Sequence, residues 1–227
     1  MNKKQVNSAI KQPCYSDSKL KLTLGVLIVV LLCAFLIVIA TFTEFSFSST
    51  HKLTVDALSN PVAFLSKTNA FEEFLLGYKY IPQVPVVLFI AALLGNRFGF
   101  ISILIYVVVG LSGLPVFTLG GGFDYIMQYT FGYILAFLPT VVIVGNILNK
   151  ITLKNIFKAI LFGVFLIHFI GILYAAFIVI LHHVSLESFL NLVTIQSGIK
   201  VIYDLIFSLF AVLLAYPVKR LLWLVMG

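Results

Sequence analysis

The chain has 227 residues, of which 61% are hydrophobic and only 10% are charged, and its mean hydropathy is +1.13. A soluble domain carries about 25% charged residues, so this composition excludes a water-soluble fold and predicts one all-α membrane domain, at residues 22–220. The net charge of +7 does not indicate nucleic-acid binding, because most basic residues lie just outside apolar segments, as membrane topology requires.

The first predicted element is a transmembrane helix at residues 22–43, a run without any charge that follows a basic tail at 1–21. A cleaved signal peptide is the alternative. It is disfavoured because the apolar run exceeds the roughly 7 to 15 residues of a signal peptide and is followed by Glu44 rather than a small-residue cleavage site. We therefore expect a retained helix with the tail in the cytoplasm.

Residues 44–81 form the longest polar segment and are expected to be an extracytoplasmic loop with a short amphipathic helix near 61–76. Five more apolar segments follow, so the prediction is about six transmembrane helices. The further segments are 82–95, 98–117, 129–148, 159–181 and 202–218, with 221–227 as the C-terminal end. The segment 82–95 rises only about 21 Å against a hydrocarbon core of about 30 Å. The six-helix count therefore depends on this short element.

The positions of Lys and Arg predict the orientation of the bundle. With the N-terminus inside, eleven of the 15 basic residues fall in cytoplasmic segments, and six of the eight acidic residues fall outside. Cytoplasmic loops collect basic residues, so both termini are expected in the cytoplasm.

The sequence contains no catalytic motif that we recognise: no nucleotide-binding glycine loop, no His-Glu-x-x-His and no serine elbow. We therefore expect a protein that is not an enzyme and needs no cofactor. His182 and His183 are the best metal ligands available, but neighbouring helical residues point in different directions. A pair of histidines at the membrane surface is the favoured interpretation, and no metal site is predicted.

The segment 106–133 combines glycines with polar and aromatic residues. Gly120, Gly121 and Gly122 allow the backbone to fold back, and such a turn can cap a cavity. Nearby side chains suited to a small amphipathic ligand are Phe117, Asp124, Gln128 and Thr130. The alternative is an ordinary glycine turn with polar loop residues.

Asp204 lies inside the last apolar segment, where a carboxylate costs about 2.5 to 3.5 kcal/mol to insert. A functional role is the first hypothesis. The alternatives are that it reaches the membrane surface or pairs with Lys200, one helical turn away. In the six-helix topology Asp204 and the glycine loop lie on the same outer face, where they can line one pocket.

Several segments resemble the BioY family, the biotin-binding S components of energy-coupling factor transporters. They are VPVVLFIAALLGNRFGF (84–100), YVVVGLSGLPVF (106–117), GGGFDY (120–125), TFGYILAF (130–137) and YDL (203–205). The resemblance covers roughly residues 80 to 217.

The resemblance implies a six-helix bundle in the bacterial plasma membrane, surrounded by lipids, that captures biotin from outside. A coupling membrane protein and ATPase subunits would supply energy, or the protein would act alone. The family positions near the ligand fall on Gly121, Gly122, Thr130, Gly132, Tyr133 and Asp204. Asp204 would accept hydrogen bonds from the ureido group, Tyr133 would pack or hydrogen-bond, and the glycines would let the loop close.

The chain also departs from the family pattern. Phe207 stands where the family has a lysine, which removes the obvious partner of a ligand carboxylate and leaves Lys200 or Lys79 as replacements. The first helix has Gly25, Ala34 and Ala40 instead of a regular Ala-x-x-x-Ala docking face. The alternatives are an S component for another small vitamin, an intramembrane lipid-modifying enzyme using Asp204 and His168, and a structural membrane protein without a ligand.

Overall fold

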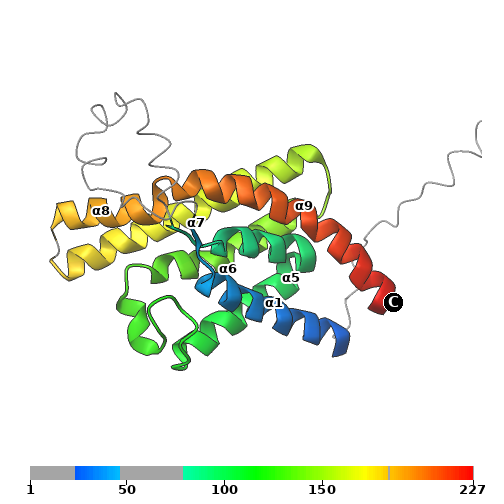
Figure 1. Ribbon diagram of the computed structural model, residues 1–227, viewed down its shortest axis with the longest axis horizontal. Coiled ribbons are helices and arrows are strands. Elements are labelled where there is room, and N and C mark those ends of the chain that lie inside the picture. The colour runs from blue at the N-terminus through cyan, green and yellow to red at the C-terminus, as the bar shows by residue number, and fades with distance from the viewer. Residues whose placement is uncertain (1–23, 47–78, 184, 227) are drawn as a thin grey trace, which may run out of the picture.

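The structure, a computed structural model, describes residues 24–46, 79–183 and 185–226, and this part is largely helical (Figure 1). The elements are α1 (Leu24–Phe42), β1 (Phe45–Ser46), β2 (Lys79–Tyr80), α5 (Gln83–Leu111), the 3-10 helix η1 (Phe123–Met127), α6 (Phe131–Ile147), α7 (Leu153–Leu181), α8 (Leu186–Ser197) and α9 (Lys200–Met226). The short strands pair antiparallel, with Phe45 opposite Tyr80. The tail at 1–21 and the helix predicted near 61–76 lie outside the described residues.

Four described segments are long and apolar enough to cross a membrane: α1, α5, α7, and α8 and α9 taken together as Leu186–Leu222. The helix α6 is apolar but shorter, with 17 residues. These segments make the chain a multi-pass membrane protein.

The helix α5 turns back on itself at Gly95, whose φ of 74° is not helical. The side chain of Gln83 donates to Thr41 Oγ1 at 2.8 Å, and the Tyr106 hydroxyl lies 3.2 Å from the same oxygen. A straight helix would separate residues 83 and 106 by about 35 Å. The two parts of α5 therefore run in opposite directions, as the separate predicted segments 82–95 and 98–117 require.

Several predicted boundaries differ from the observed ones. The second part of α5 ends at Leu111 instead of 117, because Gly113 takes a φ of 107° and Pro115 cannot continue the helical hydrogen bonding. The helix α7 begins six residues earlier than predicted, at Leu153, where the Thr152 side chain accepts a hydrogen bond from the Asn155 backbone. Lys154 and Lys158, which were assigned to a loop, lie in its first turns.

The helix α8 was not predicted. Its N-terminus is capped by Ser185, whose hydroxyl accepts from the Ser188 backbone N–H at 3.3 Å. Polar residues interrupt its apolar positions, so the sequence shows no long apolar run there. In Figure 1 it runs back beside the end of α7 and leads into α9.

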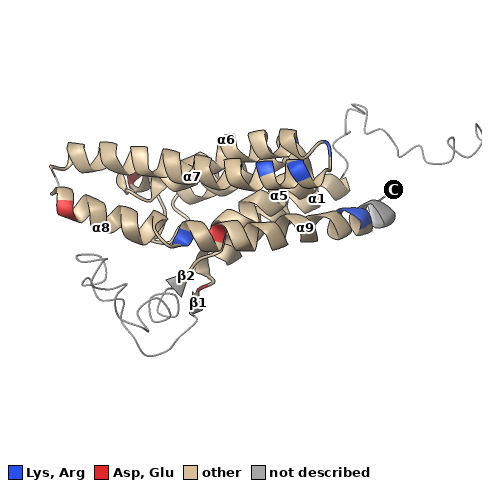
Figure 2. Cartoon of the chain, turned by 90° about the horizontal axis from the view of Figure 1, so that it is seen from above, with Lys and Arg blue, Asp and Glu red and all other residues tan. Residues whose placement is uncertain are grey.

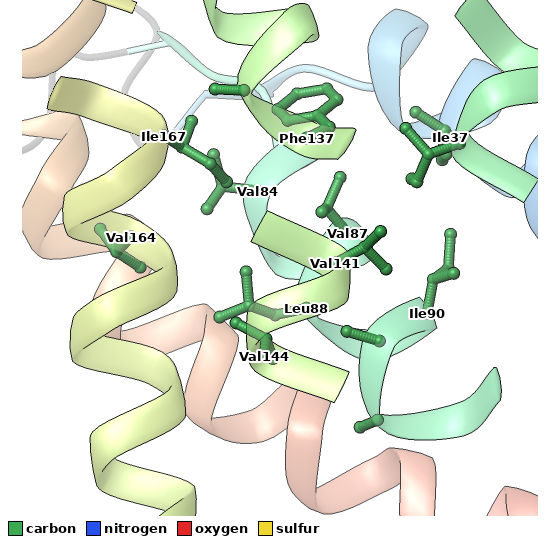
Figure 3. Close-up of a cluster of buried hydrophobic side chains, with 14 of the residues drawn as sticks. Ile37, Val84, Val87, Leu88, Ile90, Phe137, Val141, Val144, Val164 and Ile167 are labelled. Atoms are coloured by element: carbon green, nitrogen blue, oxygen red, sulfur yellow. The ribbon is translucent and has the colours of Figure 1, made fainter. Parts of the chain in front are cut away.

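The core lies where both parts of α5 meet α6 and α7 (Figure 3). Two glycines bring the backbones together. A Cβ on Gly99 would lie 2.8 Å from Val141, and one on Gly145 would lie 2.6 Å from the Asn96 backbone nitrogen. Small residues drive such close helix packing in membranes. The reversal in α5 is therefore held against the end of α6, where Asn96 donates to the Asn146 side chain at 2.7 Å.

The alanines of α1 considered for docking face inwards instead. Ala34 and Ala40 are buried, and they lie on the side of α1 that packs against α5. They therefore serve the internal packing of the chain.

Charged residues separate along the bundle (Figure 2). Among the described residues, Lys and Arg gather toward the end where α9 finishes, apart from the lysine at the start of α9. Asp and Glu lie toward the other end. This is the distribution that the predicted orientation requires, and the orientation itself stays a prediction.

Candidate functional site

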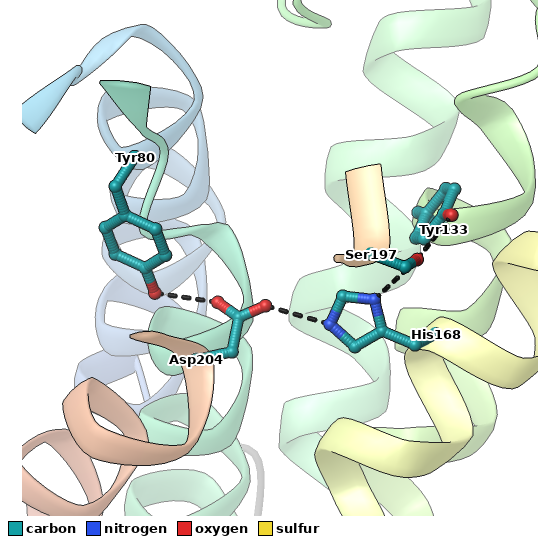
Figure 4. A network of polar contacts seen from close by, with 5 residues as sticks. All are labelled: Tyr80, Tyr133, His168, Ser197 and Asp204. Carbon is teal, nitrogen blue, oxygen red and sulfur yellow. Dashed lines mark hydrogen bonds and ion pairs between the residues drawn. The ribbon is translucent and has the colours of Figure 1, made fainter. Parts of the chain in front are cut away.

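Asp204 is the centre of a buried polar network (Figure 4). It lies one turn into α9 and is 0% exposed, so its carboxylate is enclosed by other parts of the chain. The Tyr80 hydroxyl donates to Asp204 Oδ1 at 2.7 Å, and His168 Nε2 lies 3.0 Å from Asp204 Oδ2. Among the described residues, the ion-pair partner of Asp204 is therefore His168 of α7 and not Lys200.

The network continues beyond the histidine to α8 and α6. His168 Nδ1 lies 2.9 Å from Ser197 Oγ, and the Tyr133 hydroxyl lies 2.7 Å from the same oxygen. An ionised carboxylate only accepts, so His168 Nε2 donates to Asp204. In the neutral ring Nδ1 then accepts from Ser197, and Ser197 accepts from Tyr133. Each donor of the network thus directs its hydrogen along the chain of bonds that ends at Asp204. The five residues come from β2 and from four helices, α6, α7, α8 and α9.

Two glycines make the network possible by letting α6 and α7 approach closely. A Cβ on Gly171 of α7 would lie 2.4 Å from Tyr133 Cδ1, and one on Gly132 of α6 would lie 2.2 Å from Tyr174 Cβ. Neither glycine can be replaced without moving an aromatic side chain. The predicted site residue Gly132 therefore acts by leaving room for α7.

We expect Gly171→Ala to lower the stability of the protein by about 1 to 3 kcal/mol, the usual cost of overpacking. The added methyl group would push the Tyr133 ring away and break its bond to Ser197. Thermal unfolding in detergent measures this. In a Tyr133→Ala background the same substitution should be neutral or stabilising, since alanine is the better helix former. An equal loss of stability in both backgrounds would contradict the steric explanation.

The glycine-rich loop closes over the end of α5. Phe117 and Gly120 exchange two backbone hydrogen bonds, of 2.9 and 3.0 Å, and the Gly122 N–H donates to the Gly110 carbonyl at 2.8 Å. Gly120 and Gly122 have φ of 114° and 105°, which other residues rarely adopt. A Cβ on Gly121 would lie 2.0 Å from the Leu114 carbonyl oxygen. The predicted turn is present, and each of its glycines is required by the backbone.

Aromatic rings fill the space below this loop. Phe117 is fully buried, with ring centroids 5.3 Å from Tyr106, 4.6 Å from Tyr125 and 6.5 Å from Phe131. Tyr125 bonds to Thr130 Oγ1 at 3.1 Å. The ring of Phe117 therefore supports the loop from inside.

The nine predicted site residues thus fall into two groups. Asp204 and Tyr133 belong to the buried network, joined through His168 and Ser197. The others lie in the loop or at the start of α6, with Asp124 exposed on η1 and Gln128 partly buried at its end. Within the described residues, none of the hydrogen bonds and ring contacts joins this loop group directly to Asp204.

Three members of the network were not predicted to bind the ligand: Tyr80, Ser197 and His168, the last of which was considered only for the enzymatic alternative. His168 carried a usable signal, since an ionisable residue inside an apolar segment is a functional hypothesis by default. Tyr80 lies at the end of a long polar loop, and Ser197 ends a helix that the sequence did not reveal, so neither carried a local signal.

In residues 24–46, 79–183 and 185–226, no three His, Cys, Asp or Glu side chains gather as a metal site would require. His182 caps the end of α7, and His183 takes a φ of 51° in the turn that follows. The Asp204–His168 pair is thus a hydrogen-bonded pair within a polar network.

Ionisable residues buried between the helices of a multi-pass bundle usually mark a pathway or site for a substrate, an ion or a proton. The fold matches a solved structure described as the S-component for biotin from an ECF-type ABC transporter, with a TM-score of 0.59 over 97% of this chain and 95% of that chain. At 19% identity this likeness shows the fold.

The chain belongs to the BioY family, whose sequence profile matches residues 57–223. A probable biotin transporter BioY of Lysinibacillus sphaericus is 38% identical over 120 residues, covering 48% of this chain and 61% of that protein. A probable biotin transporter BioY of Pyrococcus horikoshii is 37% identical over 95 residues, covering 41% of this chain and 56% of that protein. These matches therefore span only about 60% of the relatives' lengths.

Proposed function

We propose that this protein is the substrate-binding membrane component of a biotin uptake system. The observation that carries the proposal is the buried Asp204 network in a chain of the BioY family. A carboxylate at this depth is expensive to bury, and such residues usually mark a substrate pathway. The names of the relatives support biotin as the solute.

The chemistry of Asp204 fits the ureido group of biotin, which presents two N–H donors. Each carboxylate oxygen has two lone pairs and accepts one bond within the network, from Tyr80 or from His168. Each oxygen therefore retains the capacity to accept a ligand N–H. Tyr133, at the other end of the network, would pack on the ligand or hydrogen-bond to it.

The loop residues form the second part of the proposed site. The glycines would let the loop close over the ligand, and Thr130, Gln128 and Asp124 would supply polar groups at its edge. Phe117 would contribute by holding the loop in shape, since its ring is fully buried.

The proposed topology has six transmembrane segments with both termini in the cytoplasm of a bacterial cell. The reversal of α5 at Gly95 supports it, because it divides α5 into two antiparallel parts. The charge separation in Figure 2 supports the orientation. In this orientation Asp204 lies near the outer end of α9, on the side from which the vitamin would be captured. Coupling and ATPase subunits would complete the transporter.

We expect the purified full-length protein to bind biotin with a submicromolar Kd, which corresponds to more than about 8 kcal/mol. Isothermal titration in detergent measures this, with desthiobiotin and a vitamin without a ureido group as comparison ligands. Absence of heat with biotin, together with unchanged thermal stability in excess ligand, would contradict the proposal. A stronger response to the unrelated vitamin would favour an S component of different specificity.

One observation favours a second function, hydrolysis of an ester or amide. Ser197, His168 and Asp204 stand in the hydrogen-bonded order of a serine hydrolase triad. Biotin binding is better supported, because Ser197 Oγ is shared with Tyr133 and the family relatives are transporters. Covalent labelling of Ser197 by a fluorophosphonate, lost in Ser197→Ala, would favour the hydrolase.

A further inference from the structure

Ser208 carries a buried hydroxyl that nothing in the described part of the chain satisfies. It lies on α9 and is 0% exposed, and its Oγ has no hydrogen-bond partner among the described residues. It does not donate to the Asp204 backbone carbonyl, the bond that a helical serine commonly makes to the residue four positions earlier. The equally buried Ser102, by contrast, donates to the Val30 carbonyl at 3.1 Å.

An unpaired hydroxyl at this depth needs an explanation. Native structures pair most buried polar atoms with protein groups or ordered water, because an unpaired atom loses its hydration without replacement. The described residues contain three such side-chain oxygens, on Thr140, Ser208 and Tyr216. Ser208 is one helical turn from Asp204, whereas Thr140 lies about two turns beyond Tyr133 on α6. Ser208 is therefore the unpaired hydroxyl that follows the polar network most closely along its own helix.

Ser208 and Asp204 present complementary groups on one face of α9. Residues four positions apart in a helix share a face, with Cβ atoms about 5 to 6 Å apart. The Asp204 oxygens each accept one bond, from Tyr80 and from His168, and both partners lie on other elements (Figure 4). Each oxygen can accept one more. This face of α9 therefore offers an acceptor and, one turn further, a donor.

The ureido ring of biotin carries the matching pattern, because each of its N–H groups lies beside the carbonyl oxygen on one edge of the ring. We propose that Ser208 donates to this carbonyl oxygen while Asp204 accepts from the neighbouring N–H. The inference rests on the proposed function and adds to it a second specificity-determining residue. An ionised carboxylate only accepts, so Asp204 cannot bind the ureido oxygen itself. Ser208 thus selects ligands that present an acceptor beside the N–H donor.

Ser208→Ala should have two effects of opposite sign. The free protein should be at least as stable as the wild type, because the substitution removes a buried hydroxyl that has no described partner. The affinity for biotin should fall by about three- to tenfold, the usual worth of one hydrogen bond between neutral groups. A purely structural residue would lose stability and affinity together. Thermal unfolding and isothermal titration of the full-length protein in detergent measure the two effects.

A thioureido analogue of biotin, in which sulfur replaces the carbonyl oxygen, tests the bond itself. Sulfur is a weak acceptor, so Ser208→Ala should weaken binding of this analogue by less than about twofold. The variant should therefore lose most of the preference for biotin over the analogue. Thr140→Val is the matched control, since it removes another fully buried hydroxyl without a described partner. It should leave both affinities unchanged.

The outcomes separate this inference from the proposed function. If the wild-type protein does not bind biotin, the proposed function fails and the role of Ser208 fails with it. If the wild type binds biotin and Ser208→Ala keeps the full affinity, or weakens biotin and the thioureido analogue equally, only the role of Ser208 fails. Lower stability of Ser208→Ala with unchanged affinity would also overturn this role, and would indicate that the hydroxyl holds a buried water instead.

Discussion

Asp204→Asn is expected to weaken biotin binding by at least tenfold, about 1.4 kcal/mol. Asparagine has nearly the same shape as aspartate, but it replaces one accepting oxygen by a donating NH2 group. Both neighbours of Asp204 donate toward it when it is ionised, so the amide would place one donor against another. Hydrogen bonds to a charged acceptor are also about twice as strong as neutral ones.

Isothermal titration of the variant in detergent measures the change. Glu187→Gln is the matched control, because it makes the same carboxylate-to-amide change at an exposed residue of α8. Its affinity should equal that of the wild type. Wild-type affinity in folded Asp204→Asn would show that the carboxylate does not contact the ligand, and the proposed site would then be wrong.

The apolar segments of the fold were predictable because a membrane demands long runs without charge. Most of the described helices follow from this rule. The two parts of α5 also follow from it, because they were predicted as separate segments on either side of Gly95. This glycine lies between two apolar runs, beside the exposed Arg97. The ends were less predictable. A charge was taken as the end of a helix, but Lys154 and Lys158 continue α7 toward the membrane surface. Side chains of this length can extend to water from inside a helix.

The candidate site was predictable only in part. Asp204 was found because an isolated charge inside an apolar run is a local signal. Tyr133 was found through the resemblance to a family. Tyr80 pairs with Asp204 from 124 positions away in the chain, and no local pattern encodes such a contact. Ser197 needed the end of α8 to be known, and α8 has too few apolar residues to be recognised.

The role of His168 shows why pairs matter more than single residues here. A lone histidine in a membrane helix has several explanations, whereas a histidine between a buried carboxylate and a buried hydroxyl has both ring nitrogens engaged. This arrangement fixes the ring orientation and the tautomer. His168 thus holds Asp204 in place and connects it to Tyr133.

His168→Leu is the second substitution with a large expected effect, and it acts first on stability. Leucine fills a similar volume but cannot form hydrogen bonds. Asp204 Oδ2 would lose its bond to His168 Nε2, and Ser197 Oγ would lose its bond to His168 Nδ1. Each buried polar group left unsatisfied costs about 1 to 3 kcal/mol. Thermal or denaturant unfolding in detergent should therefore show a loss of about 2 to 6 kcal/mol if both sites stay unsatisfied.

A double-mutant cycle distinguishes loss of this pair from a general packing defect. If the Asp204–His168 bond carries the effect, His168→Leu should cost less in an Asp204→Asn background, with a coupling energy of about 0.5 to 3 kcal/mol. His182→Leu is the matched control, since His182 is exposed at the end of α7. Additive effects of the two buried substitutions would refute the pairing. Because this histidine orients the carboxylate that we propose receives the ligand, a confirmed coupling would tie the stability of the bundle to the proposed capture of its solute.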